Sequence, residues 1–211
     1  MILENLKDIK GDPKSIQTLD FKLGKDTALL FNKGIFGKSR HIVLNEAITT
    51  SSEKGYRLES ATGCTVYTNN ICPSEKKLNN TIIAFANKSR MSKIKSIGIK
   101  KLKLMDIEMK YIMDVFFMNS SKKLKQKLQK KLEKIITLTY NAKFGFIGSS
   151  ILIIKSNKDI DVKLIDFGHP FWKESDCCSD TSKENMEKVI DNYNNGLRSF
   201  IKDFKTWLET E

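Results

Sequence analysis

The feature that most constrains the fold is a short apolar run that ends in an acidic residue and a glycine. The run contains Val162, Leu164, Ile165 and Phe167, and charged residues precede it. An apolar run of this length predicts a buried strand, and the charged residues before it predict an entry turn. Gly168 favours a sharp turn after the strand, because glycine adopts backbone conformations that other residues avoid.

The predicted strand places a carboxylate, that of Asp166, at the end of a rigid element. Enzymes that transfer phosphoryl groups use such a carboxylate to hold a magnesium ion against the nucleotide phosphates. A turn-forming aspartate at the end of any buried strand gives the same Asp-Phe-Gly pattern. The pattern by itself therefore leaves a metal-binding role and a purely structural role open.

A second strand is predicted over residues 16–24, where apolar and polar residues alternate. Because side chains alternate between the two faces of a strand, Asp20 and Lys22 project from the same side. Such a pair is most often found on a solvated edge. It becomes a candidate site if a second acidic strand faces it, and Asp166 offers that strand.

The remaining segments predict an α+β fold in which helices are inserted between strands. A polar turn at 49–58 leads into a strand that continues to residue 67, and the segment 81–140 has a helical pattern. The glycine-punctuated apolar segment 144–154 predicts a strand that forms a hairpin with the strand before Asp166. Apolar residues on one face of 184–208 predict a final helix.

The net charge of +12 favours an acidic partner: nucleic acid, an anionic membrane surface or a polyphosphorylated small molecule. One lysine-rich segment, 121–136, predicts a helix with Ser121 as its N-cap and leucines at helical spacing. Its lysine face could contact a membrane or nucleic acid. No aromatic residues interleave with these lysines, however, which favours a solvated helix face.

The cysteines and the hydropathy pattern indicate where the protein is found. The four cysteines, Cys64, Cys72, Cys177 and Cys178, show no C-x-x-C spacing, which favours free thiols in a reducing compartment. No apolar run approaches the roughly 18 residues of a membrane span, and no charged-then-apolar leader opens the chain. We expect an intracellular protein, cytoplasmic or nuclear, with no membrane span.

Five short motifs occur in order along the chain. They are Asp-Phe-Lys-Leu-Gly at 20–24, a Thr/Ser-rich turn before Gly-Tyr-Arg at 49–57, Ser-Ser-Ile-Leu at 149–152, Ile-Asp-Phe-Gly-His at 165–169 and Asp-Asn-Tyr-Asn-Asn-Gly-Leu at 191–197. Together they resemble the motifs of the inositol polyphosphate kinase family, and among its branches the hexakisphosphate kinases and multikinases. Each motif alone is weak, and the signal lies in their order over nearly the whole chain.

The resemblance implies a role for each matching residue. Asp20 would orient or deprotonate an inositol hydroxyl, and Lys22 would contact the transferred phosphate and the substrate. Asp166 would hold Mg²⁺ against the ATP phosphates, with Ser150 supporting the site from the neighbouring strand. These roles suit phosphoryl transfer, which needs positioning and positive charge more than covalent chemistry.

Further residues have implied roles at the edges of this site. Arg57 and His169 would bind the substrate, His169 through one of its phosphates. Residues 3–6 are similar to the family's L-E-D-L, whose aspartate holds the nucleotide ribose. Asn5 stands at that position and keeps one acceptor without the charge. In the last motif, Asn192 replaces the glycine that precedes the tyrosine.

The resemblance implies an ATP- and Mg²⁺-dependent kinase that phosphorylates an inositol polyphosphate. Residues 1–211 would form one domain, mainly the C-terminal lobe of a fold related to protein kinases and ATP-grasp enzymes, with a helical insertion at about 81–140. The family's small N-terminal lobe, which completes the ATP pocket, would be largely missing. That absence leaves a second interpretation open, a catalytically silent module that binds inositol phosphates. Nucleic-acid binding, which rests on charge alone, is disfavoured, and the oligomeric state is left open.

Overall fold

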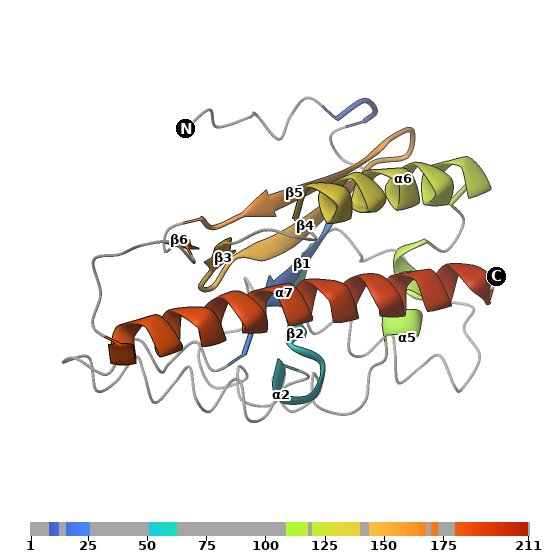
Figure 1. Ribbon diagram of the computed structural model, residues 1–211. Coiled ribbons are helices and arrows are strands. Elements are labelled where there is room, and N and C mark those ends of the chain that lie inside the picture. Colours follow the sequence, from blue (N-terminus) through green and yellow to red (C-terminus); the bar gives the residue numbers. More distant parts are fainter. Residues whose placement is uncertain are drawn as a thin grey trace, which may run out of the picture.

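A computed structural model shows helices packed against an antiparallel sheet (Figure 1). The structure describes residues 9–12, 16–25, 51–62, 109–117, 120–139, 144–167, 170–172 and 180–210. This arrangement confirms the predicted α+β class with an antiparallel sheet. In the part of the chain that the structure describes, no helix is long and apolar enough to cross a membrane.

The main sheet has four strands in the order β2-β1-β4-β5, and every neighbouring pair is antiparallel. The strands are β1 (Gln17–Leu23), β2 (Tyr56–Thr62), β4 (Ser150–Lys155) and β5 (Ile160–Ile165). The pairing of β4 with β5 confirms the predicted hairpin. Along β1, Leu19, Phe21 and Leu23 are fully buried on the core face, so Asp20 and Lys22 lie on the opposite face.

The C-terminal helix α7 (Asp180–Glu209) supplies most of the helical side of the core. Its middle part crosses in front of the sheet, with β1 and β2 behind it (Figure 1). Its buried face carries Phe200, whose ring lies 5.0 Å from that of Phe21 and 5.5 Å from that of Tyr56. Such aromatic contacts add to the free energy gained by burying the rings. The final helix was predicted from 184, and it begins four residues earlier.

Two further helices, α5 (Met109–Phe116) and α6 (Lys122–Thr139), complete the core. Both lie within the predicted helical segment, whose part 81–108 falls outside the described residues. Lys155 of β4 projects to the core face, where its Nζ donates hydrogen bonds to the Phe116 carbonyl and, at 3.2 Å, to Ser120 Oγ. These contacts compensate a charge that is almost fully buried.

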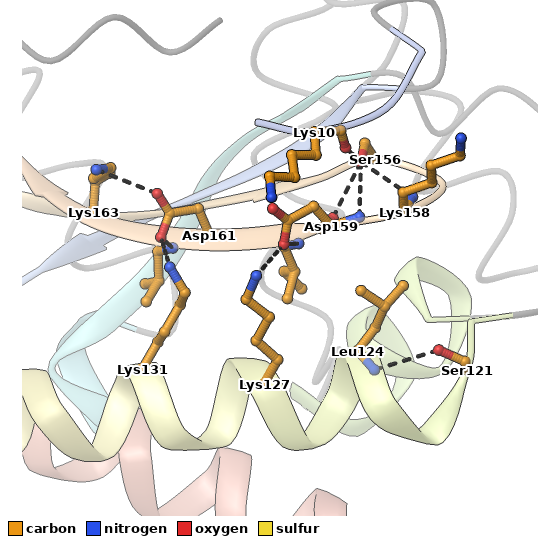
Figure 2. A network of polar contacts seen from close by, with 12 residues as sticks. Lys10, Ser121, Leu124, Lys127, Lys131, Ser156, Lys158, Asp159, Asp161 and Lys163 are labelled. Atoms are coloured by element: carbon orange, nitrogen blue, oxygen red, sulfur yellow. Dashed lines mark hydrogen bonds and ion pairs between the residues drawn. The ribbon is translucent and has the colours of Figure 1, made fainter. Parts of the chain in front are cut away.

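Helix α6 is fixed to the β4–β5 hairpin by apolar packing and by ion pairs. Leu128 and Leu132 are buried in the core, and lysines on the neighbouring face reach the hairpin. Lys127 pairs with Asp159, and Lys131 Nζ lies 2.5 Å from Asp161 Oδ1 (Figure 2). Partial burial alone would raise the pKa of Asp159, but hydrogen bonds from Lys127 and the Ile160 backbone lower it below its usual value. The apolar packing and the ion pairs therefore both fix the orientation of α6 relative to the sheet.

The hairpin also holds a segment from near the N-terminus. Ser156 Oγ donates a hydrogen bond to the Lys10 carbonyl at 2.5 Å and accepts one from the Asp159 backbone N–H at 2.9 Å (Figure 2). Gly11 has a φ of 130° and lies against the hairpin so closely that a Cβ would meet Asn157 Oδ1 at 2.6 Å. A glycine is therefore required at this contact.

Three sequence expectations are corrected by the structure. The segment 144–154 is not one strand: β3 (Phe144–Phe146) pairs with β6 (Pro170–Trp172) in a second sheet, and β4 begins only at Ser150. The break lies at Gly148, whose φ of 71° turns the chain. The predicted polar turn is a short helix, α2 (Ser51–Lys54). Phe167, predicted to be buried in the strand, follows the end of β5 and is 40% exposed.

Candidate functional site

The candidate site is built on the face of the sheet that lies away from the core helices. Asp20 and Lys22 project from this face of β1 because they alternate with its buried residues. Lys22 pairs in register with Ser150 of β4 on one side and with Arg57 of β2 on the other. The register of β1 with β2 shifts between Asp20 and Phe21, which marks a bulge beside the candidate carboxylate.

Asp166 reaches the same place from the end of β5. Its φ of 65° lies in the left-handed region, which a short polar side chain tolerates better than most. The chain therefore turns at Asp166 itself. This turn brings Asp166 Oδ2 within 3.4 Å of Lys22 Nζ, and the Asp166 side chain remains 58% exposed. The structure thus brings together the acidic strand end and the strand carrying Asp20 and Lys22, as the sequence predicted.

Asp20 is more deeply buried than Asp166, and polar atoms at its position lack hydrogen-bond partners. Burial raises the pKa of Asp20 above its usual value, while the nearby Ser150 hydroxyl and Lys22 act in the opposite direction and Glu59 adds to the rise. Among the described residues, neither Asp20 Oδ1 nor Ser150 Oγ has a hydrogen-bond partner, although both atoms are buried. Unpaired buried polar atoms are costly, and they are typical of sites that bind a ligand or an ion.

Arg57 lies beside Lys22 but is engaged within the protein. Its Nε lies 3.1 Å from Glu59 Oε2, and its Nη1 donates a hydrogen bond of 3.0 Å to Ser51 Oγ of α2. Only 11% of the Arg57 side chain is exposed. In this structure Arg57 connects α2 to β2. Its predicted contact with a substrate stays a prediction.

The motif at the middle of α7 has a structural explanation. Asn192 Nδ2 donates a hydrogen bond of 3.1 Å to the Lys25 carbonyl, so the residue that departs from the family pattern holds the chain beyond β1. Gly196 lies against a backbone hydrogen bond of 2.7 Å from Gly24 N to Gly55 O. A Cβ on Gly196 would stand 2.1 Å from Gly55 O, far inside any real contact. The glycine of this motif therefore allows α7 to approach the ends of β1 and β2.

The structure leaves two predicted site residues without a description and adds two that the sequence analysis did not single out. Asn5 and His169 fall outside the described residues. Glu59 influences Asp20 and pairs with Arg57, and its position two residues after Arg57 on one strand face could have indicated this. Ser51, which bonds Arg57, lies in a segment whose helical turn was not predicted.

The residues of this site suit one hard cation bound together with phosphates. Within the described ranges, no group of three or more His, Cys, Asp or Glu side chains could hold a metal ion. Mg²⁺ is usually bound by one or two carboxylates, with phosphate oxygens and water completing its shell. The exposed carboxylate of Asp166 provides a ligand of that kind.

The sequence and the fold are both similar to those of known proteins. A family model of inositol polyphosphate kinase matches residues 2–205. The fold is similar to that of inositol phosphate multikinase Ipk2 from S. cerevisiae, solved in complex with ADP and Mn²⁺, with a TM-score of 0.58 and 18% identity over 92% of this chain and 79% of that chain. Another inositol phosphate multikinase structure gives a TM-score of 0.54 and 17% identity, over 98% of this chain and 85% of that chain. No match was found among curated proteins.

Proposed function

The chain belongs to the inositol polyphosphate kinase family, and we propose that it is an ATP-dependent kinase that transfers a phosphoryl group to an inositol polyphosphate. The observation that carries this proposal is the meeting of Asp20, Lys22 and Asp166 on one face of the sheet. Two separate strands supply these residues, and Lys22 joins them through its ion pair with Asp166. The fold, which is similar to that of multikinases, supports the same conclusion.

Asp20 has the properties expected of the residue that prepares the attacking hydroxyl. A carboxylate whose pKa is raised accepts a proton more readily at neutral pH than an ordinary aspartate does. Burial raises the pKa of Asp20, so Asp20 has this property. We therefore assign Asp20 to orienting the inositol hydroxyl and removing its proton.

Lys22 and Asp166 form the charged part of the proposed site. Lys22 supplies a positive charge for the moving phosphoryl group, which spreads negative charge over its oxygens during transfer. Asp166, with Ser150 beside it, is the proposed ligand of Mg²⁺. A bound metal ion supplies neutralisation of the ATP phosphates. Lys22 pairs with Asp166, and this ion pair orients the two side chains toward each other.

The other assignments have support from the family alone. We propose that Arg57 and His169 bind the substrate and that Asn5 contacts the nucleotide. An intracellular location, cytoplasmic or nuclear, is likewise a proposal. The predicted absence of an N-terminal lobe is not confirmed, because the family match extends over residues 2–205 and the chain covers 79% of the Ipk2 chain.

A pair of matched variants tests the proposed function. Asp166→Asn removes the proposed metal ligand, and we expect its rate of transfer from ATP to an inositol polyphosphate to fall by more than about a hundredfold. Asp161→Asn is the control, because Asp161 lies on β5, the strand that leads to Asp166, and is engaged by Lys131, Lys163 and the Val162 backbone N–H. Its rate should stay within a few-fold of the wild type.

The outcomes of this comparison separate the two interpretations of the family resemblance. Equal rates for Asp166→Asn and the wild type would contradict the assignment of Asp166. A wild-type chain that binds inositol polyphosphates without any turnover, under conditions where it is folded, would contradict the kinase and identify a silent binding module. Binding of the substrate and of ATP is measured separately by calorimetry, so that loss of turnover is not mistaken for loss of binding.

A further inference from the structure

Helix α6 presents a straight row of lysines to solvent. Lys123, Lys127, Lys130 and Lys134 are all exposed, and their spacing of four, three and four residues places them on one helix face. The same face continues to Leu138, four residues further on, which is 70% exposed. We call these five residues the lysine row. At the rise of an α-helix the row is about 22 Å long.

The direction of the lysine row is determined by the rest of the fold. Leu128 and Leu132 are buried on the opposite face of α6, so the lysine row faces away from the core. The ion pair of Lys127 with Asp159 and that of Lys131 with Asp161 fix the helix against the hairpin (Figure 2). Lys127 is therefore partly neutralised, and three lysines of the row remain.

These three lysines, Lys123, Lys130 and Lys134, make no ion pair with a carboxylate in the described ranges. Within the described helices α6 and α7, the imbalance is found in α6, which carries seven lysines and one glutamate. The exposed face of α7 mixes both signs of charge: Glu184, Glu187, Lys188, Asp191, Arg198, Lys202, Lys205 and Glu209. The two helices therefore differ in their charge pattern, although both belong to one lysine-rich chain.

We propose that the lysine row is a docking surface for an anionic membrane, on which α6 lies parallel to the lipid surface. Lysines on one side of a helix bind acidic head groups through long-range attraction. Leu138 gives the row an apolar end, which can enter the boundary between head groups and acyl chains. This surface is separate from the kinase site, and the proposal does not depend on phosphoryl transfer.

The side chains of the row favour a membrane over nucleic acid. The row contains no arginine, whose planar guanidinium binds phosphates in a bidentate manner. It also lacks aromatic residues on which bases could stack. On a membrane, the exposed leucine removes apolar area from water.

Vesicle co-sedimentation of the full chain tests this proposal, without nucleotide present. Vesicles of phosphatidylcholine with roughly one-third phosphatidylserine should bind the chain, and vesicles of phosphatidylcholine alone should not. Each lysine near an anionic surface contributes a factor of about five in affinity, so Lys130→Gln with Lys134→Gln should weaken binding by roughly 25-fold. Leu138→Gln should weaken it several-fold.

A matched control separates the row from net charge. Lys202→Gln with Lys205→Gln removes the same charge from the exposed face of α7, and its binding should change by less than about threefold. Circular dichroism confirms that each variant is folded. Equal losses in the two double variants, or equal binding to neutral and anionic vesicles, would overturn the proposal. Tighter binding to duplex RNA or DNA than to anionic vesicles, lost in the Lys130/Lys134 variant, would assign the row to nucleic acid instead and also overturn it.

Discussion

Replacing Gly196 by alanine should destabilise the protein, although the same change in an ordinary helix would stabilise it. Alanine is favoured over glycine in a helix interior by about 1 kcal/mol. In this structure the new Cβ would stand 2.1 Å from Gly55 O and 2.9 Å from Gly24 N. These two atoms belong to the backbone hydrogen bond that joins the end of β1 to the turn before β2. Neither atom can move aside as a flexible side chain could.

The expected magnitude follows from three contributions. Overpacking against backbone costs about 1–3 kcal/mol. Loss of the hydrogen bond from Gly24 to Gly55 costs about 1 kcal/mol, and the gain in helix propensity offsets a similar amount. The net loss of unfolding free energy for Gly196→Ala should therefore be about 1–3 kcal/mol. For a chain of this length it should lower Tm by roughly 2–12 °C.

Urea denaturation of Gly196→Ala, followed by circular dichroism, measures this loss. Asn195→Ala is the control, because Asn195 is exposed in the same turn of α7 and its replacement should stabilise the helix by about 0.5 kcal/mol. If Gly196→Ala were as stable as the wild type, or more stable, the close approach of α7 to β1 and β2 would be refuted. The motif glycine would then need another explanation.

Three further changes test other parts of the account. Asp159→Asn should reduce the free energy of unfolding near neutral pH by up to about 1 kcal/mol, because the lowered pKa of Asp159 reflects its pairing with Lys127. The difference in unfolding free energy from the wild type should vanish as the pH falls well below 4. Lys155→Ala should lower the free energy of unfolding, measured by urea denaturation, by about 2–4 kcal/mol, because it removes the hydrogen bond to the Phe116 carbonyl and leaves a cavity. An unchanged denaturation midpoint would contradict the buried contact. Asp20→Asn should abolish transfer yet raise the free energy of unfolding at neutral pH, because the raised pKa of Asp20 means that folding disfavours its charged form. This gain should disappear at acidic pH, where wild-type Asp20 is protonated. A loss of stability at neutral pH would contradict the burial of the charged form.

The sequence predicts those parts of the fold in which side-chain periodicity determines burial. Residues 18–23 of β1 alternate between polar and apolar, so the side on which Asp20 and Lys22 lie could be predicted. The long C-terminal helix has one apolar face and was also predicted. The break between β3 and β4 was not predicted, although Gly148 and the two serines that follow it interrupt the apolar run at this point. Only the positive φ of Gly148 ends one strand and starts another in a different sheet.

The candidate site was predictable as a set of residues but not as a geometry. The motifs identified Asp20, Lys22 and Asp166, and the structure brings Lys22 and Asp166 within 3.4 Å. That the chain turns at Asp166 in a left-handed conformation depends on its surroundings and has no signal in the local sequence. The hydrogen bond from Arg57 to Ser51 depends on how α2 is placed against β2, which the sequence does not encode locally.

The central claim is that the face carrying Asp20, Lys22 and Asp166 transfers phosphate to an inositol polyphosphate. The most direct test is a time course with γ-labelled ATP, Mg²⁺ and a panel of inositol phosphates, using the purified 211-residue chain. The account predicts that label appears in an inositol polyphosphate product with the wild type, and that chelating the metal or introducing Asp166→Asn stops it. Label that remains in ATP for every inositol phosphate tested, with a folded chain that binds both ligands, would contradict the claim.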